Sequence, residues 1–573
     1  MRGAALDASG TAAQGPRGAP LRKFGNTERL SRERTLVIGE QFDFPLPENL
    51  NLGAFFLDVN LDLGRGDKTA IYHRDQACSF RDLWVLTNKM GNVLRELGVE
   101  PENRVLLILE DSPQWVAAWL ATMKVGGVGT HAYTYLRPHD YAYLIDLVRP
   151  KVVVVDSATL ARVREGCERC THRPGLLAAG AGVADLRPGE FSLRDRIAQA
   201  GDTLEVESTH RDDPAFWNFS GGTTGKPKGV PHMHRDGVVA YESFDHILRY
   251  ASDDIVLSVP KLFFHYSRDL GLLYPLRNGA AVVLLDQRTT AALIFDSIRK
   301  YRPTVLINVP TMMRAMLQTP EAERADMRCI RHSMSSGELL SAPLNGEWVR
   351  AFGCEVINRF GSAESGIGYL CNRPGAVRPG SSGTVTPLSQ IKLMNDDGQE
   401  VAAGQPGVLW VRSDASGVYY VREREKSGST FLGDEWVNTG DVFVQDEDDY
   451  FWYVGRADDM VKVSGVWVSP LEIEKALQES PRVRECAVFG IKDADGLVKI
   501  KAFVVPADGM QADGKAGTET GAHALPEMQD ELKQFCRERL APHKIPRSME
   551  FLPELPKTGQ GKIDRRLLRE QLL

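Results

Sequence analysis

The ten residues SGGTTGKPKG, at positions 220–229, hold four glycines, two adjacent threonines and two lysines. A glycine inside a helix costs roughly 1 kcal/mol against alanine, so this composition predicts a loop. Its backbone N–H groups, hydroxyls and ammonium groups suit a bound phosphate. The stretch is not a P-loop of the GxxxxGK[ST] type, because Pro227 follows Lys226 and Ser220 replaces the first glycine. A plain glycine-rich turn is the weaker interpretation, since a turn rarely needs two threonines and two lysines together.

Apolar runs of strand length alternate with amphipathic helical stretches on both sides of this loop. The expected buried strands are RVLLILE (104–110), KVVVVD (151–156), AAVVLLD (280–286) and TVLINVP (304–310). Such continuous runs are typical of parallel strands that are covered on both faces. Residues 79–99 and 115–126 carry a helical pattern. The alternation predicts an α/β fold with layered β-sheets covered by helices.

The pattern changes after about residue 383, where strand-type alternation and turns become more frequent, as in VLWVRS (408–413) and YFWYVG (450–455). We expect a β-barrel-like subdomain there. A small α+β region follows, and its expected elements are a helix at 469–480, strands at 485–491 and 499–506, and a flexible Gly/Ala-rich loop at 507–524. The predicted parts are a flexible leader (1–45), a large N-terminal domain (46–456) and a small, mobile C-terminal domain (457–573).

The composition limits the class of protein. A chain of 573 residues is too long for one hydrophobic core. With 43% hydrophobic and 25% charged residues it is typical of a soluble globular protein, and its net charge of −7 argues against nucleic-acid binding. No apolar run approaches the roughly 18 residues of a membrane span. We therefore expect a cytoplasmic protein, and the sequence leaves open whether it forms a homodimer.

Neither the cysteines nor the N-terminus indicates a special site or destination. Only Cys167 and Cys170 form a C-x-x-C pair, Thr171 stands where a c-type haem needs histidine, and no second ligand pair for zinc has suitable spacing. Reduced cytosolic thiols are the favoured interpretation. The leader lacks the apolar segment of a secretory signal, and Asp7 and Glu28 weigh against an organelle transit peptide.

Four further stretches accompany the opening loop. They are NRFGSAESG (358–366), NTGDVF (438–443), GRADDMVKVSGVWVSPLEIE (455–474) and PKTGQGKIDRRLL (556–568). In this order and spacing the five motifs resemble those of the adenylate-forming superfamily of acyl-CoA synthetases, adenylation domains and luciferases, from about residue 50 to the end. The resemblance implies that a carboxylic acid attacks the α-phosphate of ATP, giving an acyl-adenylate and pyrophosphate. The small domain then rotates, and a thiol, usually that of coenzyme A, takes the acyl group.

The resemblance also implies an ATP site. Its residues are Ser220, Gly221, Gly222, Thr223, Thr224, Gly225, Lys226, Lys228, Ser336, Gly337, Glu338, Asn358, Arg359, Phe360, Asp441 and Arg456. The loop holds the β- and γ-phosphates, residues 336–338 and 358–360 form the two walls of the adenine slot, Asp441 holds the ribose hydroxyls, and Arg456 supports ribose and phosphate. Glu364 is the expected Mg²⁺ ligand, because a carboxylate beside phosphates needs an intervening cation. Ala363 stands where the family usually has threonine, so that hydroxyl contact is lost or supplied by a neighbour.

The C-terminal region carries the expected moving parts. Asp458 matches the hinge between the domains, although a capping aspartate in a tight turn is a fair alternative. Gly465 is expected to line the thiol tunnel, and Lys462 to assist thioester formation. Lys562 is the expected catalytic cation, which bridges the carboxylate and the phosphate and stabilises the charge that develops between them. The following Arg565 and Arg566 are interpreted as a solvated helix face.

The chain looks most similar to benzoate-type aryl-CoA ligases within this superfamily. The cues are PKLFF before the pocket, DYAYLI (140–145) and DDMVKVSGVWVSPLEIE (458–474). By this analogy the residues around the aromatic ring are His265, Tyr266, Gly361, Ile367 and Gly368. These benzoate ligases carry a small residue in place of His265 and a histidine in place of Ile367, which favours a substituted acid such as anthranilate or a hydroxybenzoate. A plain structural role for His265 is equally favoured.

Three functions follow as hypotheses. The leading one is an ATP-dependent aryl-CoA ligase that uses ATP, Mg²⁺ and coenzyme A. A second is an adenylating enzyme that loads a carrier protein in trans. A binding module that has lost its chemistry is the third, and Lys562, Glu364 and Asp441 argue against it.

Overall fold

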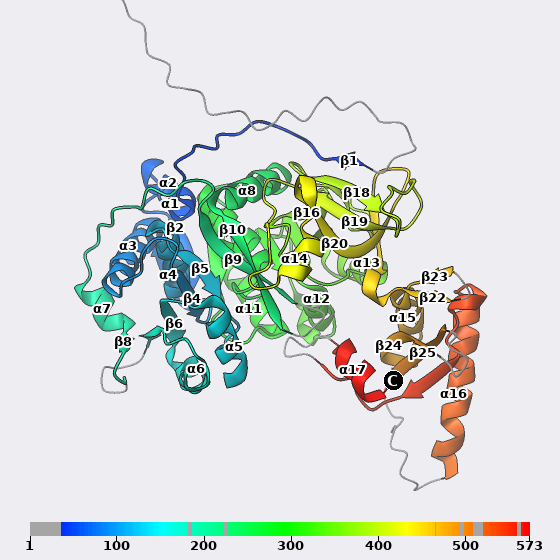
Figure 1. The fold of residues 1–573 in the computed structure, drawn as a ribbon. Coiled ribbons are helices and arrows are strands. Elements are labelled where there is room, and N and C mark those ends of the chain that lie inside the picture. Colours follow the sequence, from blue (N-terminus) through cyan, green and yellow to red (C-terminus); the bar gives the residue numbers. More distant parts are fainter. Residues whose placement is uncertain are drawn as a thin grey trace, which may run out of the picture.

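The computed structural model describes residues 36–180, 186–221, 226–463, 466–492, 498–507, 519–557 and 563–572. Figure 1 shows two groups of elements along the chain. Strands β1 to β21 with their helices form the larger group, and β22 to β26 with α15, α16 and α17 form a smaller group beside it. The boundaries 46–456 and 457–573 remain predictions, although the smaller group lies within the second range.

A seven-stranded sheet holds the phosphate loop at its edge. Its strands, in spatial order, are β10 (Pro227–Met233), β9 (Pro214–Gly221), β5 (Val128–His131), β4 (Arg104–Ile108), β6 (Val152–Asp156), β7 (Gly175–Ala179) and β8 (Glu190–Ser192). All pairs are parallel except β9 with β10. The four valines of β6 are fully buried, as expected for a strand covered on both faces.

A nine-stranded sheet follows in the chain. Its order is β17 (Thr384–Val385), β16 (Gly368–Cys371), β15 (Val356–Gly361), β14 (His332–Ser335), β13 (Val305–Asn308), β11 (Ile255–Ser258), β12 (Ala281–Leu284), β2 (Thr69–His73) and β3 (Gln76–Ser79). Its middle is parallel, whereas both edges are antiparallel. The motif at 358–366 begins in β15 of this sheet and continues past the end of that strand.

A five-stranded antiparallel sheet corresponds to the predicted barrel-like subdomain. Its order is β1 (Val37–Ile38), β18 (Gln390–Met394), β19 (Gly407–Arg412), β20 (Trp436–Gln445) and β21 (Phe451–Arg456). Buried and half-buried residues alternate along β19, which is the pattern of a strand with one face in the core. Strands β20 and β21 carry Asp441 and Arg456 opposite one another.

The helices cover these sheets. In the larger group they are α1 (Leu52–Leu57), α2 (Val59–Asp62), α3 (Phe80–Glu96), α4 (Pro113–Lys124), α5 (Pro138–Val148), α6 (Ser157–Arg169), α7 (Leu193–Gln199), α8 (His234–Leu248), α9 (His265–Arg268), α10 (Tyr274–Asn278), α11 (Ala291–Tyr301), α12 (Pro310–Leu317), α13 (Ala342–Phe352) and α14 (Arg424–Thr430). The predicted helix at 79–99 begins with a capping box, because Ser79 and Asp82 bond each other's backbone N–H groups.

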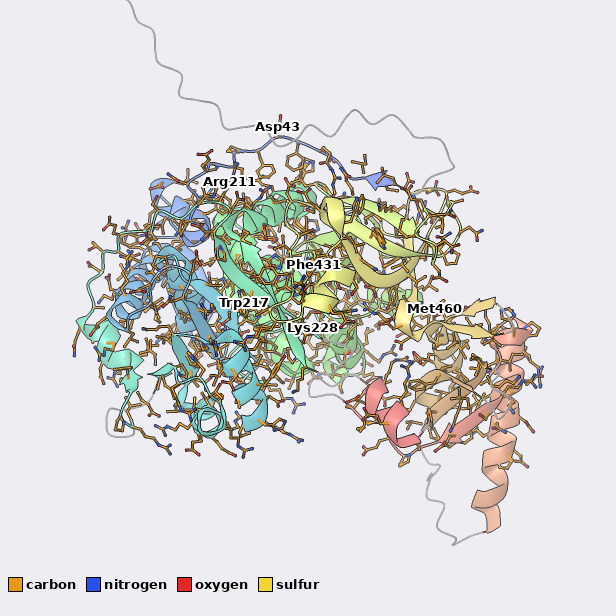
Figure 2. All side chains as sticks on the ribbon, in the orientation of Figure 1. Asp43, Arg211, Trp217, Lys228, Phe431 and Met460 are labelled. Carbon is orange, nitrogen blue, oxygen red and sulfur yellow. The ribbon has the colours of Figure 1, made fainter. Side chains whose placement is uncertain are left out.

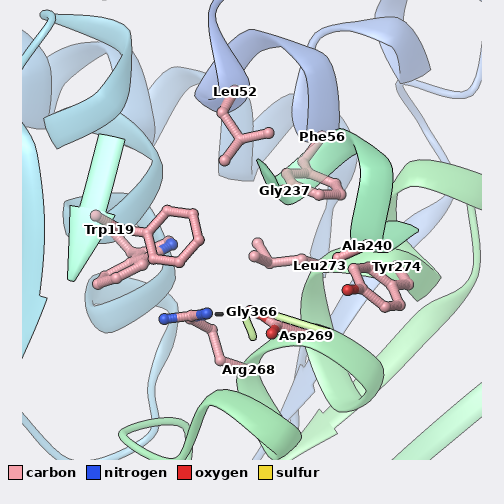
Figure 3. Close-up of a pocket in the computed structure, with 11 residues that line it drawn as sticks. Leu52, Phe56, Trp119, Gly237, Ala240, Arg268, Asp269, Leu273, Tyr274 and Gly366 are labelled. Atoms are coloured by element: carbon pink, nitrogen blue, oxygen red, sulfur yellow. Dashed lines mark hydrogen bonds and ion pairs between the residues drawn. The ribbon is translucent and has the colours of Figure 1, made fainter. Parts of the chain in front are cut away.

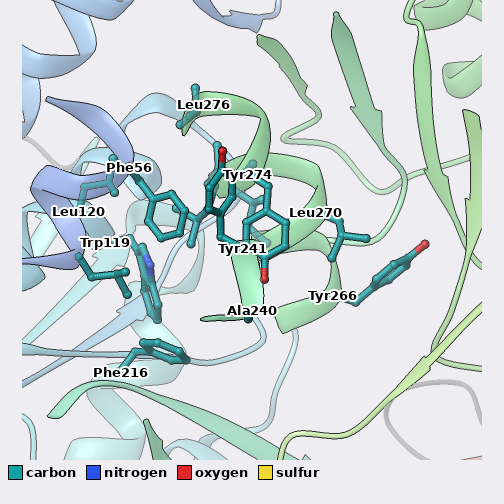
Figure 4. Packing of buried hydrophobic residues seen from close by; sticks show 14 of the residues in the cluster. Phe56, Trp119, Leu120, Phe216, Ala240, Tyr241, Tyr266, Leu270, Tyr274 and Leu276 are labelled. Atoms are coloured by element: carbon teal, nitrogen blue, oxygen red, sulfur yellow. The ribbon is translucent and has the colours of Figure 1, made fainter. Parts of the chain in front are cut away.

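An aromatic cluster forms the centre of the largest core. Figure 4 shows Phe56 of α1, Trp119 of α4, Tyr241 of α8 and Tyr274 of α10 close together in this core. The ring centroids of Phe56 and Tyr274 lie 6.2 Å apart, and those of Tyr241 and Tyr274 lie 5.6 Å apart. Contacts of this kind tie the helices to one core and hold α9 and α10 in place beside the site.

The smaller group has its own core. It contains the hairpin β22 (Val461–Val463) and β23 (Val466–Val468), the sheet β24 (Val483–Lys492), β25 (Val498–Pro506) and β26 (Ser548–Phe551), and the helices α15 (Pro470–Gln478), α16 (Glu519–Arg537) and α17 (Arg565–Leu572). The prediction of a loop at 507–524 was wrong for its last residues, because α16 begins at Glu519. The small residues there join a longer amphipathic helix, which a composition-based prediction does not detect.

Arg565 was wrongly predicted to be a solvated residue. Its guanidinium pairs with the buried carboxylate of Glu474, which also accepts a hydrogen bond of 2.7 Å from the backbone N–H of Val488. The side chain of Arg565 also lies 5.4 Å from the ring centroid of Phe489. This ion pair therefore joins α17 to α15 and β24.

Replacing Arg565 by methionine is expected to lower the free energy of unfolding of the C-terminal part by about 3 kcal/mol, because Glu474 would be left buried without its cation. Urea unfolding followed by tryptophan fluorescence and circular dichroism measures the loss. The matched control is Arg537→Met on the exposed face of α16, which should change stability by less than about 0.5 kcal/mol. Equal stability of the two variants would show that the pair contributes little.

Candidate active site

Strands β9 and β10 hold the two ends of the phosphate loop together. Pro227 pairs with Gly221, and Lys228 pairs with Ser220. Lys228, labelled in Figure 2, is buried. Its ammonium group lies 4.9 Å from the ring centroid of Tyr420. The ammonium group of Lys226 lies 5.0 Å from the ring centroid of Tyr143.

The described residues do not include Gly222, Thr223, Thr224 and Gly225.

Burial lowers the pKa of Lys228. Lys426 lowers this pKa further, whereas Glu364 raises it. A cation that rests on an aromatic face beside the loop is suited to meet an incoming phosphate.

Glu364 follows β15 and is positioned from both sides. The hydroxyl of Tyr420 donates a 2.6 Å hydrogen bond to Glu364 Oε1, and Gly417 N donates one of 2.9 Å to the backbone oxygen of Glu364. His232 is buried, and its Nε2 lies 2.8 Å from the carbonyl oxygen of Ala363, the residue before Glu364. The carboxylate is therefore fixed at the surface of a rigid turn.

The donors around Glu364 fit Mg²⁺ held jointly with substrate phosphates. Mg²⁺ prefers oxygen ligands and usually binds through one or two carboxylates together with phosphates and water. In the described part of the chain no group of three or more His, Cys, Asp or Glu side chains forms a complete metal cage. A single carboxylate beside a phosphate loop agrees with that mode of binding.

The buried Asp441 of β20 pairs with the partly exposed Arg456 at the end of β21. Arg456 Nη1 lies 3.1 Å from Asp441 Oδ1 and 3.0 Å from the carbonyl oxygen of Thr439. The hydroxyl of Tyr453 lies 3.4 Å from Asp441 Oδ1. Burial raises the pKa of Asp441 to about 6, although Arg456 opposes the shift. Burial disfavours the charge of Arg456, but Asp441 and Tyr453 outweigh it and raise the pKa of that guanidinium.

Phe360 of β15 faces this pair. Its ring centroid lies 5.4 Å from that of Tyr453 and 5.1 Å from that of Phe443. The neighbouring Asn358 donates a 2.9 Å hydrogen bond from Nδ2 to the carbonyl oxygen of Ser381. An aromatic face beside a buried carboxylate is a suitable wall for a base attached to a ribose.

The loop after β14 carries the residues predicted to form the opposite wall. Gly337 has a φ of +81°, and a Cβ there would meet no atom within 4 Å, so a ligand could approach the backbone closely. Ser336 is buried. Glu338 Oε2 accepts hydrogen bonds from Thr311, at 3.0 Å from the backbone N and 2.6 Å from Oγ1. The carboxylate of Glu338 thus fixes the loop to α12.

Arg359 points away from the nucleotide wall. Successive side chains of a strand face opposite sides, so Arg359 lies on the face of β15 opposite to Asn358 and Phe360. Its guanidinium carbon lies 5.0 Å from the ring centroid of Phe244 and 5.7 Å from that of Tyr266. The structure therefore groups Arg359 with the predicted acid-binding residues rather than with the adenine slot.

The predicted acid-binding residues surround Arg359. Gly361 and Gly368 pair across β15 and β16, and a Cβ on Gly368 would lie 2.1 Å from Arg359 Nε. Ile367 and Tyr266 are buried, and the Tyr266 hydroxyl donates a 3.4 Å hydrogen bond to the carbonyl oxygen of Asn308.

His265 begins α9 beside this group. Burial lowers the pKa of His265 well below its usual value, and Arg359 and Arg268 add to this effect. The imidazole is therefore neutral at physiological pH, with one ring nitrogen able to donate a hydrogen bond and the other able to accept one.

A small cavity lies deeper in the core (Figure 3). Its walls include Trp119, Arg268, Asp269, Tyr274 and Gly366, and its volume is about 10 Å³. That is room for roughly one water molecule. Arg268 Nε lies 2.8 Å from Asp269 Oδ1, so the charges in this cavity already neutralise each other. The cavity does not serve as an acid pocket in this conformation.

The C-terminal site residues are only partly described. Asp458 lies in a 3₁₀ turn, η5 (Ala457–Asp459), between β21 and β22. Lys462 is in the middle of β22, and its side chain is outside the described part. Gly465 and Lys562 also lie outside the described residues. Lys557 and Ile563, which flank residues 558–562, pair in an antiparallel bridge.

Three residues near the site were missed by the sequence analysis. Tyr420 bonds to Glu364, Tyr453 lies between Phe360 and Asp441, and His232 supports Ala363. Tyr453 lies in the predicted strand YFWYVG, where its alternation with Trp452 could have indicated its face. Tyr420 and His232 carry no local signal, because their contacts join segments that are far apart in the chain.

None of the helices that the structure describes is long and apolar enough to cross a membrane.

The chain is matched by the AMP-binding enzyme family over residues 62–420 and by the AMP-binding enzyme C-terminal domain over residues 472–562. It is 36% identical to a 4-hydroxybenzoate–CoA/benzoate–CoA ligase of Rhodopseudomonas palustris, covering 91% of this chain and 94% of the relative. It is 35% identical to a benzoate–CoA ligase of Thauera aromatica, covering 93% and 99%.

Solved structures agree with these matches. The crystal structure of an anthranilate CoA ligase in complex with anthranoyl-AMP superposes with a TM-score of 0.81 at 34% identity, covering 92% of this chain and 98% of that one. The predicted resemblance and the two-domain α/β fold are thereby confirmed. The chain belongs to the AMP-binding, adenylate-forming enzyme family and is similar within it to aryl-CoA ligases.

Proposed function

We propose that this ATP-dependent acid–coenzyme A ligase activates a benzoate-type aromatic acid, through an aroyl-AMP, and transfers the aroyl group to coenzyme A. AMP and pyrophosphate are released. The observation that carries the proposal is a cluster of charged residues from three sheets: Lys228 lies against Tyr420, Tyr420 donates a hydrogen bond to Glu364, and Arg456 pairs with Asp441. The similarity to benzoate and hydroxybenzoate CoA ligases supports the aromatic acid.

Each group in the cluster has a proposed task. Lys226, Lys228 and the loop 220–225 hold the β- and γ-phosphates, Asp441 binds the ribose hydroxyls, and residues 336–338 with Phe360 enclose the adenine. Glu364 would hold Mg²⁺, which neutralises phosphate charge when bound. Lys562 would then approach the carboxylate and the α-phosphate, offsetting the repulsion between two anions.

Further residues are proposed to act at the hinge, at the thiol and around the aromatic ring. Asp458 would be the hinge, Lys462 and Gly465 would act at the thiol, and His265, Tyr266, Gly361, Ile367 and Gly368 would enclose the ring. The neutral imidazole of His265 suits a substituent that both donates and accepts hydrogen bonds, such as the amino group of anthranilate or the hydroxyl of a hydroxybenzoate. A cytoplasmic location, a homodimer and the use of a carrier protein as acceptor stay predictions.

Mass spectrometry of reaction products tests the proposed function. The reactions contain ATP, Mg²⁺ and one of benzoate, anthranilate, 4-hydroxybenzoate, cinnamate or octanoate, each with and without coenzyme A. We expect aroyl-CoA from one aromatic acid, and aroyl-AMP alone when coenzyme A is left out. Adenylate that never passes to coenzyme A would favour a carrier protein. Activation of octanoate alone would overturn the aromatic assignment.

The titration of Asp441 gives a pH prediction. Its carboxylate can accept both ribose hydroxyls only when ionised. Since its folded pKa is raised to about 6, protonation sets in as the pH falls through 6, and the KM for ATP should rise below that value. Asp441→Asn should raise this KM by roughly 10- to 100-fold at pH 8 and remove the rise on acidification. Steady-state kinetics from pH 5 to 8 measure both effects, and an unchanged pH profile in the variant would contradict the assignment.

A further inference from the structure

Arg359 is a buried cation for which the described part of the chain offers no counter-ion. The residue is 4% exposed, and Arg359 Nε has no hydrogen-bond partner among the described residues. Within the described ranges no acidic side chain forms an ion pair with it; its guanidinium is placed instead over the rings of Phe244 and Tyr266. Aromatic faces attract a cation but do not neutralise it.

The other charges nearby do not offset this one. Arg268 and Asp269 pair with each other at 2.8 Å, and Arg268 also bonds Asn218 at 3.0 Å. His265 is neutral, and the cation of Arg359 is one cause of its lowered pKa. Burying an unpaired charge is costly unless a partner of opposite charge arrives. An anion that binds beside Arg359 would therefore compensate its buried charge.

The position of Arg359 indicates which anion this is. The carboxylate that is activated must reach the α-phosphate on the nucleotide side, where Phe360, Tyr453 and Asp441 lie. Arg359 extends from the opposite face of β15, toward Tyr266 and Gly368. A group bound there belongs to the other end of the acid.

We propose that Arg359 recognises a second ionised group on the aromatic acid, so that the preferred substrate class is an aromatic dicarboxylic acid. The guanidinium can bind a carboxylate through two parallel hydrogen bonds, which a neutral amino or hydroxyl substituent cannot match. This inference rests on the proposed aryl-CoA ligase function and takes a carboxylate, in place of the amino or hydroxyl group considered above, as the substituent that the acid carries.

The test compares acid-dependent pyrophosphate release for benzoate and the 1,2-, 1,3- and 1,4-benzenedicarboxylates, with 4-hydroxybenzoate as a neutral-substituent probe. The enzymes are the wild type, Arg359→Met, Arg359→Lys and the control Arg378→Met, which removes a half-buried arginine paired with Asp446 and Asp448. For the wild type we expect kcat/KM to be roughly 100-fold higher for one dicarboxylate than for benzoate. Arg359→Met should remove that preference, because it should lower kcat/KM for the dicarboxylate roughly 30-fold more than kcat/KM for benzoate, and Arg359→Lys should retain part of it.

A binding measurement accompanies the kinetics. Without ATP, the preferred dicarboxylate should raise the Tm of the wild type and of Arg378→Met but not that of Arg359→Met, since a ligand of the folded state stabilises it. This readout also shows whether each variant is folded. Arg359→Lys serves as the second variant if the methionine protein does not fold.

The possible outcomes separate the inference from the proposed function. If Arg359→Met lowered the activity with every acid by the same factor, Arg359 would hold the reacting carboxylate or act structurally, and the inference would fail. Activation of benzoate but of no dicarboxylate would overturn the inference and leave the aryl-CoA ligase intact. If no aromatic acid released pyrophosphate, the proposed function would fail, and the Tm shift alone would decide whether Arg359 binds a dicarboxylate.

Discussion

Replacing Lys562 by alanine is expected to lower the rate of acyl-adenylate formation by roughly 10²- to 10³-fold. The reaction brings a carboxylate against a phosphate, and a single ammonium group between them would stabilise charge that is present only at that moment. Because the interaction is made in the transition state, kcat should fall while the affinity for ATP stays nearly unchanged. Single-turnover formation of aroyl-AMP measures the rate, and fluorescence titration measures ATP binding.

The matched control for Lys562 is Lys557 on the same segment. Lys557 Nζ pairs with Glu485 Oε1 at 2.6 Å, so its charge is already engaged in the C-terminal group. Lys557→Ala should change adenylate formation by less than about 5-fold, because an exposed ion pair contributes about 0 to 1 kcal/mol. Equal losses in the two variants would indicate a general effect of charge near this segment and would remove the special role of Lys562.

Replacing Glu364 by glutamine should slow adenylate formation by roughly 100-fold at low Mg²⁺, or about 3 kcal/mol of transition-state stabilisation. Glutamine keeps the shape and can still accept the hydrogen bond of Tyr420, but it lacks the charge that Mg²⁺ requires. Rates measured across a Mg²⁺ series should therefore recover in part at high concentration.

Tyr420→Phe separates the metal role of Glu364 from its positioning. This variant removes the 2.6 Å hydrogen bond while leaving the carboxylate in place. We expect a loss of about 10-fold, in line with about 1.5 kcal/mol for one hydrogen bond to a charged group. A Glu364→Gln enzyme that matched the wild type at every Mg²⁺ concentration would rule out a metal role for this carboxylate.

The parallel strands were the most predictable part of the fold. Runs such as KVVVVD became β6, because a strand buried on both faces must be apolar throughout. The end of the loop at 507–524 could not be predicted in this way. Its glycines and alanines are compatible with both loop and helix, and packing of Met528 and Leu532 on the C-terminal core favours the helix α16.

The residue types at the site could be predicted from the sequence, but the directions in which their side chains point could not. The motif at 358–366 predicted that Asn358, Arg359 and Phe360 share a wall, whereas the pleat of β15 turns Arg359 to the other face. Arg565 looked like a solvated helix residue until Glu474, 91 positions earlier, was seen beside it. Two residues that contact each other but lie far apart in the sequence form no short motif, so the sequence alone does not reveal their contact.

The central claim is that this enzyme forms an acyl-adenylate from an aromatic acid, and exchange of labelled pyrophosphate into ATP tests it most directly. The measurement uses the full chain with ATP, Mg²⁺ and an aromatic acid, and without coenzyme A. We predict that label enters ATP only when the acid is present, because reversal of adenylate formation requires the bound aroyl-AMP. Absence of acid-dependent exchange with benzoate, the hydroxybenzoates, anthranilate and the benzenedicarboxylates would contradict the account.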